Sequence, residues 1–171
     1  MYQQIFMDRV IALSRQAIDK LGTQPFGALL VRNGEIVGEG LNHAIKHQDP
    51  TSHGEIEAIR DACHRLQTND LSDCDMYAIG EPCPMCTAAI KLSRIRHLYY
   101  GATHSDATAA FKPLASTEYA DIGVTALRHD VCLPIEQRST SSSQHQRSAC
   151  SEVYNDWVAV TLRRCTGDNS A

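Results

Sequence analysis

Two short clusters in the chain bring together residue types that can bind a metal ion and move protons. His53-Gly54-Glu55 and, about thirty residues later, Pro82-Cys83-Pro84-Met85-Cys86 supply an imidazole, two thiols and a carboxylate. An imidazole and two thiolates suit zinc, and a site with three protein ligands leaves a fourth position for water, as in catalytic zinc sites. We therefore predict one zinc ion per chain, with a bound water or hydroxide, held by His53, Cys83 and Cys86.

Glu55 is the candidate catalytic residue of this site. Two thiolate ligands nearly cancel the charge of a zinc ion, so a base must complete the deprotonation of the bound water. Residues two positions apart on a regular helix point about 200° away from each other. His53 and Glu55 can share one site only if His53 stands at the very first position of a helix, and the motif therefore predicts where that helix begins. Gly54 between them permits close approach to the backbone.

Two other interpretations of these residues remain open. The Cys-x-x-Cys spacing of Cys83 and Cys86 at a helix start is also typical of dithiol redox proteins, in which the helix N-terminus lowers a thiol pKa. A structural zinc site would instead need a fourth protein ligand, for which Cys63, His64 and Cys74 are the candidates. Cys63 lies on the apolar stripe of a predicted helix, which is more typical of a core residue.

Alternating helix and strand patterns surround both clusters. Apolar spacing of three and four residues predicts helices over 5–21, 53–66 and 84–95, with a shorter helix over 106–111. Short apolar runs predict five strands, over 26–31, 36–41, 75–80, 97–102 and 124–133. Asn33-Gly34 favours a tight antiparallel hairpin between the first two strands. This order predicts a three-layer α/β/α fold with a mixed five-stranded sheet.

Length, charge and composition restrict the class of protein. The 171 residues fit one domain over 1–171, with a serine-rich mobile connector near 139–148 and a C-terminal docking helix near 150–164. A net charge of −4 and the lack of a Lys/Arg run argue against a large nucleic-acid partner. No apolar stretch approaches the ~18 residues of a membrane span. Seven cysteines without a secretory signal are not typical of a disulfide framework, so we expect a cytoplasmic protein.

His-x-Glu followed by Pro-Cys-x-x-Cys resembles the zinc-dependent cytidine and nucleobase deaminase superfamily. The chain looks like the bacterial guanine deaminase branch over about residues 20–112, in the segments 25–28, 42, 49–51, 53–60, 81–86 and 104–107. The resemblance implies a cytidine deaminase-like fold, hydrolytic release of ammonia from a free nucleobase, and a homodimer. It also implies that Glu55 carries protons, that Asn42 hydrogen-bonds the base and that Phe26 packs on it.

Gly54 and Asp106 are further candidates for substrate binding. Asp106 can equally cap the short helix that follows Thr103, and Asn42 and Phe26 can equally be a turn residue and a core residue.

Two departures from the family pattern bear on the substrate. Most relatives have alanine in place of Gly54, whereas fungal cytosine deaminases share His-Gly-Glu, which favours a pyrimidine. Lys112-Pro113 stands where guanine deaminases carry an Asp-Asp pair, so a carboxylate suited to an amino-substituted purine is missing there. A guanine-like base is the predicted substrate. A cytosine or isocytosine-type pyrimidine and an adenosine in transfer RNA are the alternatives.

Overall fold

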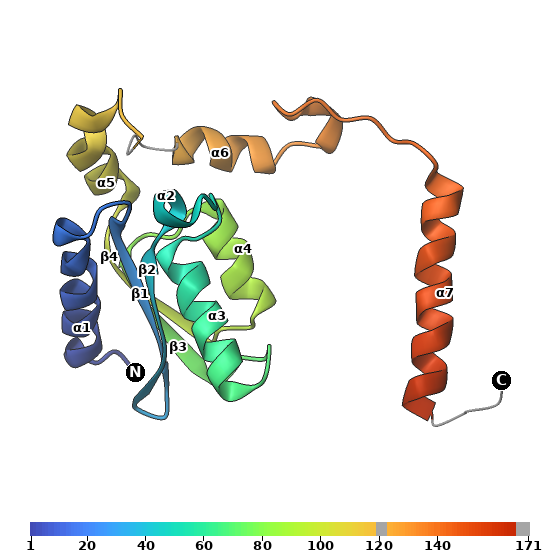
Figure 1. The fold of residues 1–171 in the computed structure, drawn as a ribbon, viewed down its shortest axis with the longest axis horizontal. Helices are drawn as coiled ribbons and strands as arrows, with labels where there is room; N and C mark the ends of the chain where they lie inside the picture. Colours follow the sequence, from blue (N-terminus) through green and yellow to red (C-terminus); the bar gives the residue numbers. More distant parts are fainter. Residues whose placement is uncertain (119–122, 167–171) are drawn as a thin grey trace. The chain divides into compact units, whose positions relative to one another are not determined.

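The computed structural model describes residues 1–118 and 123–166, which form two compact units (Figure 1). The first unit spans Met1–Val131 and the second begins at Cys132. The second unit holds a 3₁₀ turn, η3 (Ile135–Gln137), and one long helix, α7 (Arg147–Thr166). The proposed single domain over 1–171 stays a prediction.

The first unit contains the elements that build the site. In chain order they are α1 (Gln4–Arg15), η1 (Gln16–Asp19), β1 (Gln24–Arg32), β2 (Glu35–Asn42), α2 (Ala44–His47), α3 (Gly54–Leu66), β3 (Cys74–Gly80), α4 (Pro84–Leu92), β4 (His97–Ala102), α5 (His104–Phe111), η2 (Lys112–Leu114) and α6 (Val124–Val131).

The sheet is mixed, with the strand order β2-β1-β3-β4. β1 pairs antiparallel with β2 and with β3, whereas β3 pairs parallel with β4. The predicted hairpin between β1 and β2 is confirmed: Asn33 and Gly34 have φ angles of 53° and 83°, the positive values that a two-residue hairpin turn needs. The parallel pair requires a crossover, which α4 provides.

Helices cover both faces of this sheet, as the three-layer prediction required (Figure 1). Side chains alternate between the two faces along β1. Leu29 and Val31 pack with Val10 and other α1 residues, whereas Leu30 packs with Ala62 of α3 and with Ile90 of α4. Each face therefore has its own apolar layer, and α3 and α4 share the face opposite α1.

α3 lies against β2 where two glycines of that strand face it. Gly38 and Gly40 are two residues apart and therefore point to the same side of the sheet. A methyl group at Gly40 would collide with the carbonyl oxygen of Gly54 and the nitrogen of Ala58, both of which belong to the backbone of α3. The first turn of α3 is thus positioned by direct contact between backbones.

The prediction of a fifth strand over 124–133 was wrong. The described residues contain four strands, and 124–131 forms the helix α6. Val124, Leu127 and Val131 follow a helical spacing of three and four residues, and this spacing outweighs the β-branched residues that indicated a strand.

The C-terminal helix is longer than predicted. α7 begins at Arg147, inside the segment expected to be a connector, and its apolar side chains Val153, Tyr154 and Trp157 are exposed. Among the described residues, no helix combines the length and the apolar character needed to cross a membrane.

Candidate metal centre and cavity

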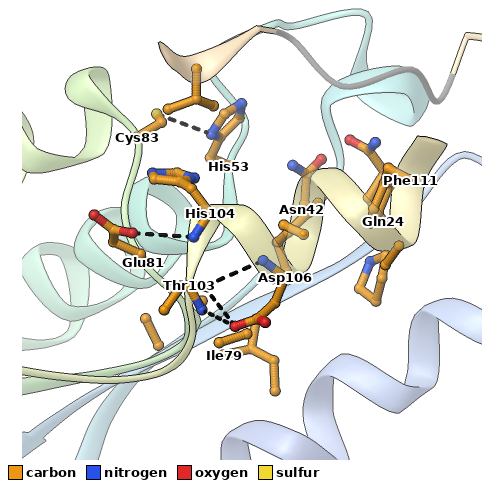
Figure 2. Close-up of a pocket in the computed structure, with 18 of the residues that line it drawn as sticks. Gln24, Asn42, His53, Ile79, Glu81, Cys83, Thr103, His104, Asp106 and Phe111 are labelled. Carbon is orange, nitrogen blue, oxygen red and sulfur yellow. Dashed lines mark hydrogen bonds between the residues drawn. The ribbon is translucent and has the colours of Figure 1, made fainter. Parts of the chain in front are cut away.

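The first turns of α3 and α4 bring the two sequence clusters together. His53 and Cys83 are the N-cap residues of these helices, both with extended backbone, and Cys86 lies in the first turn of α4. The Nδ1 atom of His53 lies 3.7 Å from the Sγ atom of Cys83 (Figure 2). The same nitrogen lies 3.5 Å from the Sγ atom of Cys86. The predicted start of the helix at His53 is confirmed. Because the backbone of His53 is extended, the separation of about 200° on a regular helix does not apply between its imidazole and the Glu55 side chain.

The positions of these three atoms fit a zinc ion. Tetrahedral coordination with Zn–N bonds of about 2.0–2.1 Å and Zn–S bonds of about 2.3 Å puts a nitrogen and a sulfur ligand about 3.6 Å apart. Among the described residues, His53, Cys83 and Cys86 are the one group of potential ligands whose donor atoms all lie within 4.8 Å of one another. They form a candidate zinc site of three protein ligands, with Nδ1 as the imidazole ligand.

The other candidate ligands lie elsewhere. Cys74 is fully buried in the apolar layer between the sheet and α3, where burial raises the pKa of its thiol to about 11. Cys63 packs against the same layer, and His64 is outside the group of three. A structural zinc site with a fourth protein ligand therefore has no support among the described residues.

The thiols of the two cysteines influence each other through a hydrogen bond. A hydrogen bond from Cys86 lowers the pKa of the Cys83 thiol to about 4, and a hydrogen bond from His53 acts in the same direction. The pKa of Cys86 is raised because it donates that bond, and burial adds to the effect. The opposite directions describe one coupled pair of thiols that are joined by a hydrogen bond. The sulfurs are not joined in a disulfide.

Glu55 lies beside the ligands without belonging to their group. Its side chain is buried, with a relative exposure of 9%, and it lines the same cavity as His53 and Cys83. Burial raises the pKa of Glu55, and this effect exceeds the opposing influence of its hydrogen bonds and of the His53 charge. A buried carboxyl group with a raised pKa next to a metal site can both accept and return a proton.

A cavity of about 340 Å³ opens from this centre. That volume is at the small end of the range of ligand pockets. Its walls come from the start of β1, the ends of β2, β3 and β4, and helices α5 and α6. A small planar molecule in this cavity can therefore reach His53, Cys83 and Glu55 together.

The predicted substrate residues divide into two groups. Phe26, Asn42 and Asp106 line the cavity, whereas Gly54 does not. Asn42 also acts as a turn residue, because its Oδ1 accepts a hydrogen bond from the backbone N–H of Ala44. The Asp106 carboxylate accepts hydrogen bonds from the backbone and hydroxyl of Thr103, forming a capping box at the start of α5 (Figure 2). A methyl group at Gly54 would collide with the carbonyl oxygen of Phe26.

Several cavity residues carried no functional assignment in the sequence. Phe111 stacks on Phe26 with ring centroids 5.3 Å apart and planes at 24°, so two aromatic rings form one wall. Gln24, Glu81 and His104 also line the cavity. The sequence did contain one signal for Phe111. It is the last residue of the predicted short helix, whose other residues are small, and a lone aromatic side chain there needs a packing partner.

Comparisons with known proteins agree with this geometry. Residues 1–102 match the cytidine and deoxycytidylate deaminase zinc-binding region. The chain is 40% identical over 110 residues to a guanine deaminase of Bacillus subtilis, which covers 64% of this chain and 70% of the relative. It is 38% identical over 102 residues to a tRNA-specific adenosine deaminase of Aquifex aeolicus, which covers 60% of this chain and 67% of that protein.

The solved structure of guanine deaminase from Bacillus subtilis superposes with a TM-score of 0.81 at 31% identity. The superposition covers 93% of this chain and 95% of that structure, and the likeness therefore extends well beyond the two motifs. The chain belongs to the cytidine and deoxycytidylate deaminase zinc-binding family.

Proposed function

We propose that this protein is a zinc-dependent hydrolytic deaminase of a free nucleobase, with a guanine-like base as its substrate. The observation that carries the proposal is the position of Glu55, a buried carboxyl group beside three zinc-type ligands and inside a small cavity. The likeness to a guanine deaminase over most of both chains supports the choice of base. The overall reaction replaces the amino group of the ring with oxygen from water and releases ammonia.

His53 Nδ1 and the sulfurs of Cys83 and Cys86 would hold the zinc ion, which when bound lowers the pKa of a water from 15.7 to about 7. Glu55 would accept one proton from the attacking water, whose oxygen bonds to the ring carbon that bears the amino group, and would pass this proton to the ring nitrogen. It would then take the second proton from the new hydroxyl group and deliver it to the amino group, which leaves as ammonia. The raised pKa of Glu55 lets it retain the proton between these steps.

The cavity walls orient the base. Phe26 and Phe111 offer aromatic surface against which a planar ring can stack, and Asn42 brings an amide to the same cavity. Gly54 allows the first turn of α3 to lie against the carbonyl of Phe26, which fixes the distance between that aromatic wall and Glu55. Asp106 supports the wall by starting α5 at Thr103.

Deamination of adenosine in transfer RNA is the second candidate, because several relatives of similar identity carry that activity in their names. Binding to folded RNA depends mainly on contacts between basic side chains and phosphates. The net charge of −4 is unfavourable for such contacts and supports a small, uncharged substrate. A cytosine or isocytosine-type pyrimidine would also fit a cavity of this size.

Ammonia release distinguishes these candidates. Zinc-loaded protein is incubated separately with guanine, cytosine, isocytosine, adenine and an adenosine-containing tRNA anticodon stem-loop, with Glu55→Gln as the control. We expect the highest kcat/KM with guanine and no release by the control. Fastest release from the stem-loop would favour RNA editing, and no release from any of these substrates would reject the deaminase proposal.

The proposal includes a homodimer in the cytoplasm. The exposed apolar residues Val153, Tyr154 and Trp157 of α7 support a partner surface. The seven cysteines are all free, which supports a reducing compartment. Light scattering coupled to size-exclusion chromatography should give twice the mass of 18.9 kDa, and a monomer mass would contradict the dimer.

A further inference from the structure

Glu81 joins three segments around the cavity. It directly follows β3, and one carboxylate oxygen accepts the backbone N–H of His104 at the start of α5, 3.1 Å away (Figure 2). The other oxygen accepts a hydrogen bond of 2.7 Å from the Nη2 atom of Arg128, in α6. The pKa of Glu81 is lowered, mainly by the bond from Arg128. A charged carboxylate therefore ties α5 and α6 to the segment that leads into α4.

Arg128 also touches the backbone next to the metal centre. Its Nη2 atom lies 3.4 Å from the carbonyl oxygen of Pro82, and the Nε2 atom of His104 lies 3.3 Å from the same oxygen. Pro82 immediately precedes Cys83, one of the three candidate zinc ligands. The guanidinium group thus connects α6 to the loop that carries a ligand, although Arg128 itself does not line the cavity.

α6 forms part of the cavity wall through Val124. Val124 and Arg128 are four residues apart and therefore lie on the same face of the helix. No residue of α6 is fully buried, and Val124 and Leu127 are half-buried. The contacts of Arg128 with Glu81 and Pro82 therefore add polar anchors close to the point where Val124 meets the cavity.

We propose that Arg128 is a latch that holds α6 as a cover over the cavity, and that this cover opens to admit the base and release the product. The Arg128–Glu81 ion pair is partly exposed, with side-chain exposures of 45% and 28%. Exposed ion pairs contribute little stability and weaken further with salt. A contact of this strength favours the closed cover by about two- to fivefold and still allows frequent opening. The proposal takes the cavity of the proposed function as the substrate site.

The first test measures opening without using a substrate. Zinc-loaded wild type and Arg128→Ala are mixed with excess EDTA to measure the rate of zinc removal, and amide hydrogen exchange is followed in 124–131. Loss of an exposed ion pair should accelerate both processes about two- to fivefold. Sodium chloride should accelerate zinc removal from the wild type and have little effect on the variant.

Arg32→Ala is the matched control. Arg32 forms an ion pair of 2.6 Å with Asp73 at similar exposure, and neither residue lines the cavity. If Arg128→Ala folds poorly, Arg128→Lys retains the charge and should give rates between those of the wild type and the alanine variant. The latch would be overturned if the Arg128 variants showed wild-type rates of zinc removal and amide exchange. It would also be overturned if Arg32→Ala accelerated both processes as much as Arg128→Ala.

Steady-state kinetics separate the latch from the proposed function. With guanine, Arg128→Ala should raise KM about two- to fivefold and change kcat less, because Arg128 touches no reacting atom. If no base is deaminated but EDTA removes zinc faster from Arg128→Ala, the proposed function fails and the latch stands. If guanine is deaminated and Arg128→Ala matches the wild type in KM, zinc removal and exchange, the latch fails alone.

Discussion

Gly40→Ala perturbs the backbone contact that positions the first turn of α3. Gly40 is buried in β2, and a methyl group there would meet three atoms of α3 closer than 3.0 Å. Two of these atoms belong to the backbone, at Gly54 and Ala58, and the third is the Cβ atom of Glu57 at 2.8 Å. Backbone atoms cannot rotate away as the end of a long side chain can, so the start of α3 must move as a unit. His53 and Glu55 are at this end of the helix.

The expected loss of stability in Gly40→Ala combines two opposing effects. Overpacking of a core costs about 1–3 kcal/mol, and three simultaneous contacts favour the upper part of this range. Alanine recovers about 0.5–1 kcal/mol over glycine in a strand. The net loss is therefore about 1–2 kcal/mol, which lowers the melting temperature by roughly 2–8 °C for a chain of this length. A shift of the site by about 1 Å lowers kcat/KM by up to ~100-fold.

Thermal unfolding of zinc-loaded protein measures the change in melting temperature. Ammonia release measures the change in kcat/KM. Gly80→Ala is the control for stability, because it also replaces a strand glycine but its methyl group would have its nearest neighbour at 3.8 Å. We expect Gly80→Ala to melt at or above the wild-type temperature. If Gly40→Ala melts together with Gly80→Ala and retains full activity, backbone contact does not position α3, and the reasoning is refuted.

Three further substitutions test the roles assigned to the site. Glu55→Gln should retain one zinc per chain by elemental analysis while kcat falls about 10²- to 10⁴-fold, because glutamine cannot carry the proton; a fully active variant would contradict the mechanism. Cys86→Ala should lose zinc and melt at a lower temperature, because metal binding contributes to folding; stoichiometric zinc in this variant would show that the ligand is another residue. Asn42→Ala should retain zinc and raise KM up to about tenfold through loss of a hydrogen bond to the base; an unchanged KM would remove Asn42 from substrate binding.

The local parts of this molecule could be predicted from the sequence. Asn33-Gly34 determined the hairpin through backbone angles that few other residues adopt, and the bounds of β4, His97–Ala102, follow directly from its apolar run. The two-residue interval between His53 and Glu55 required a helix that starts at His53, because no regular helix could bring both side chains to one point. Steric and geometric rules acting over a few residues were enough in these cases.

The parts that depend on distant contacts could not be predicted in the same way. The apolar residues of 124–133 fit a short strand as well as a helix, and the choice depends on neighbours that the sequence does not reveal. Glu81 and Arg128 are 47 residues apart, and nothing in their own segments links them. The stacking of Phe111 on Phe26 likewise joins residues from opposite ends of the cavity-forming region.

The candidate ligands His53 and Cys83 lie thirty positions apart in the chain, with one helix, one strand and the turns between them. A metal ion bound to both would act as a crosslink that closes this loop and removes chain entropy from the unfolded state. For a closed loop of this length, that entropy is worth about 3–4 kcal/mol. The crosslink joins elements on one side of the sheet only, because α1 packs on the opposite face. A bound zinc ion would therefore have an architectural effect as well as a chemical one, concentrated in the half of the molecule that carries the candidate catalytic groups.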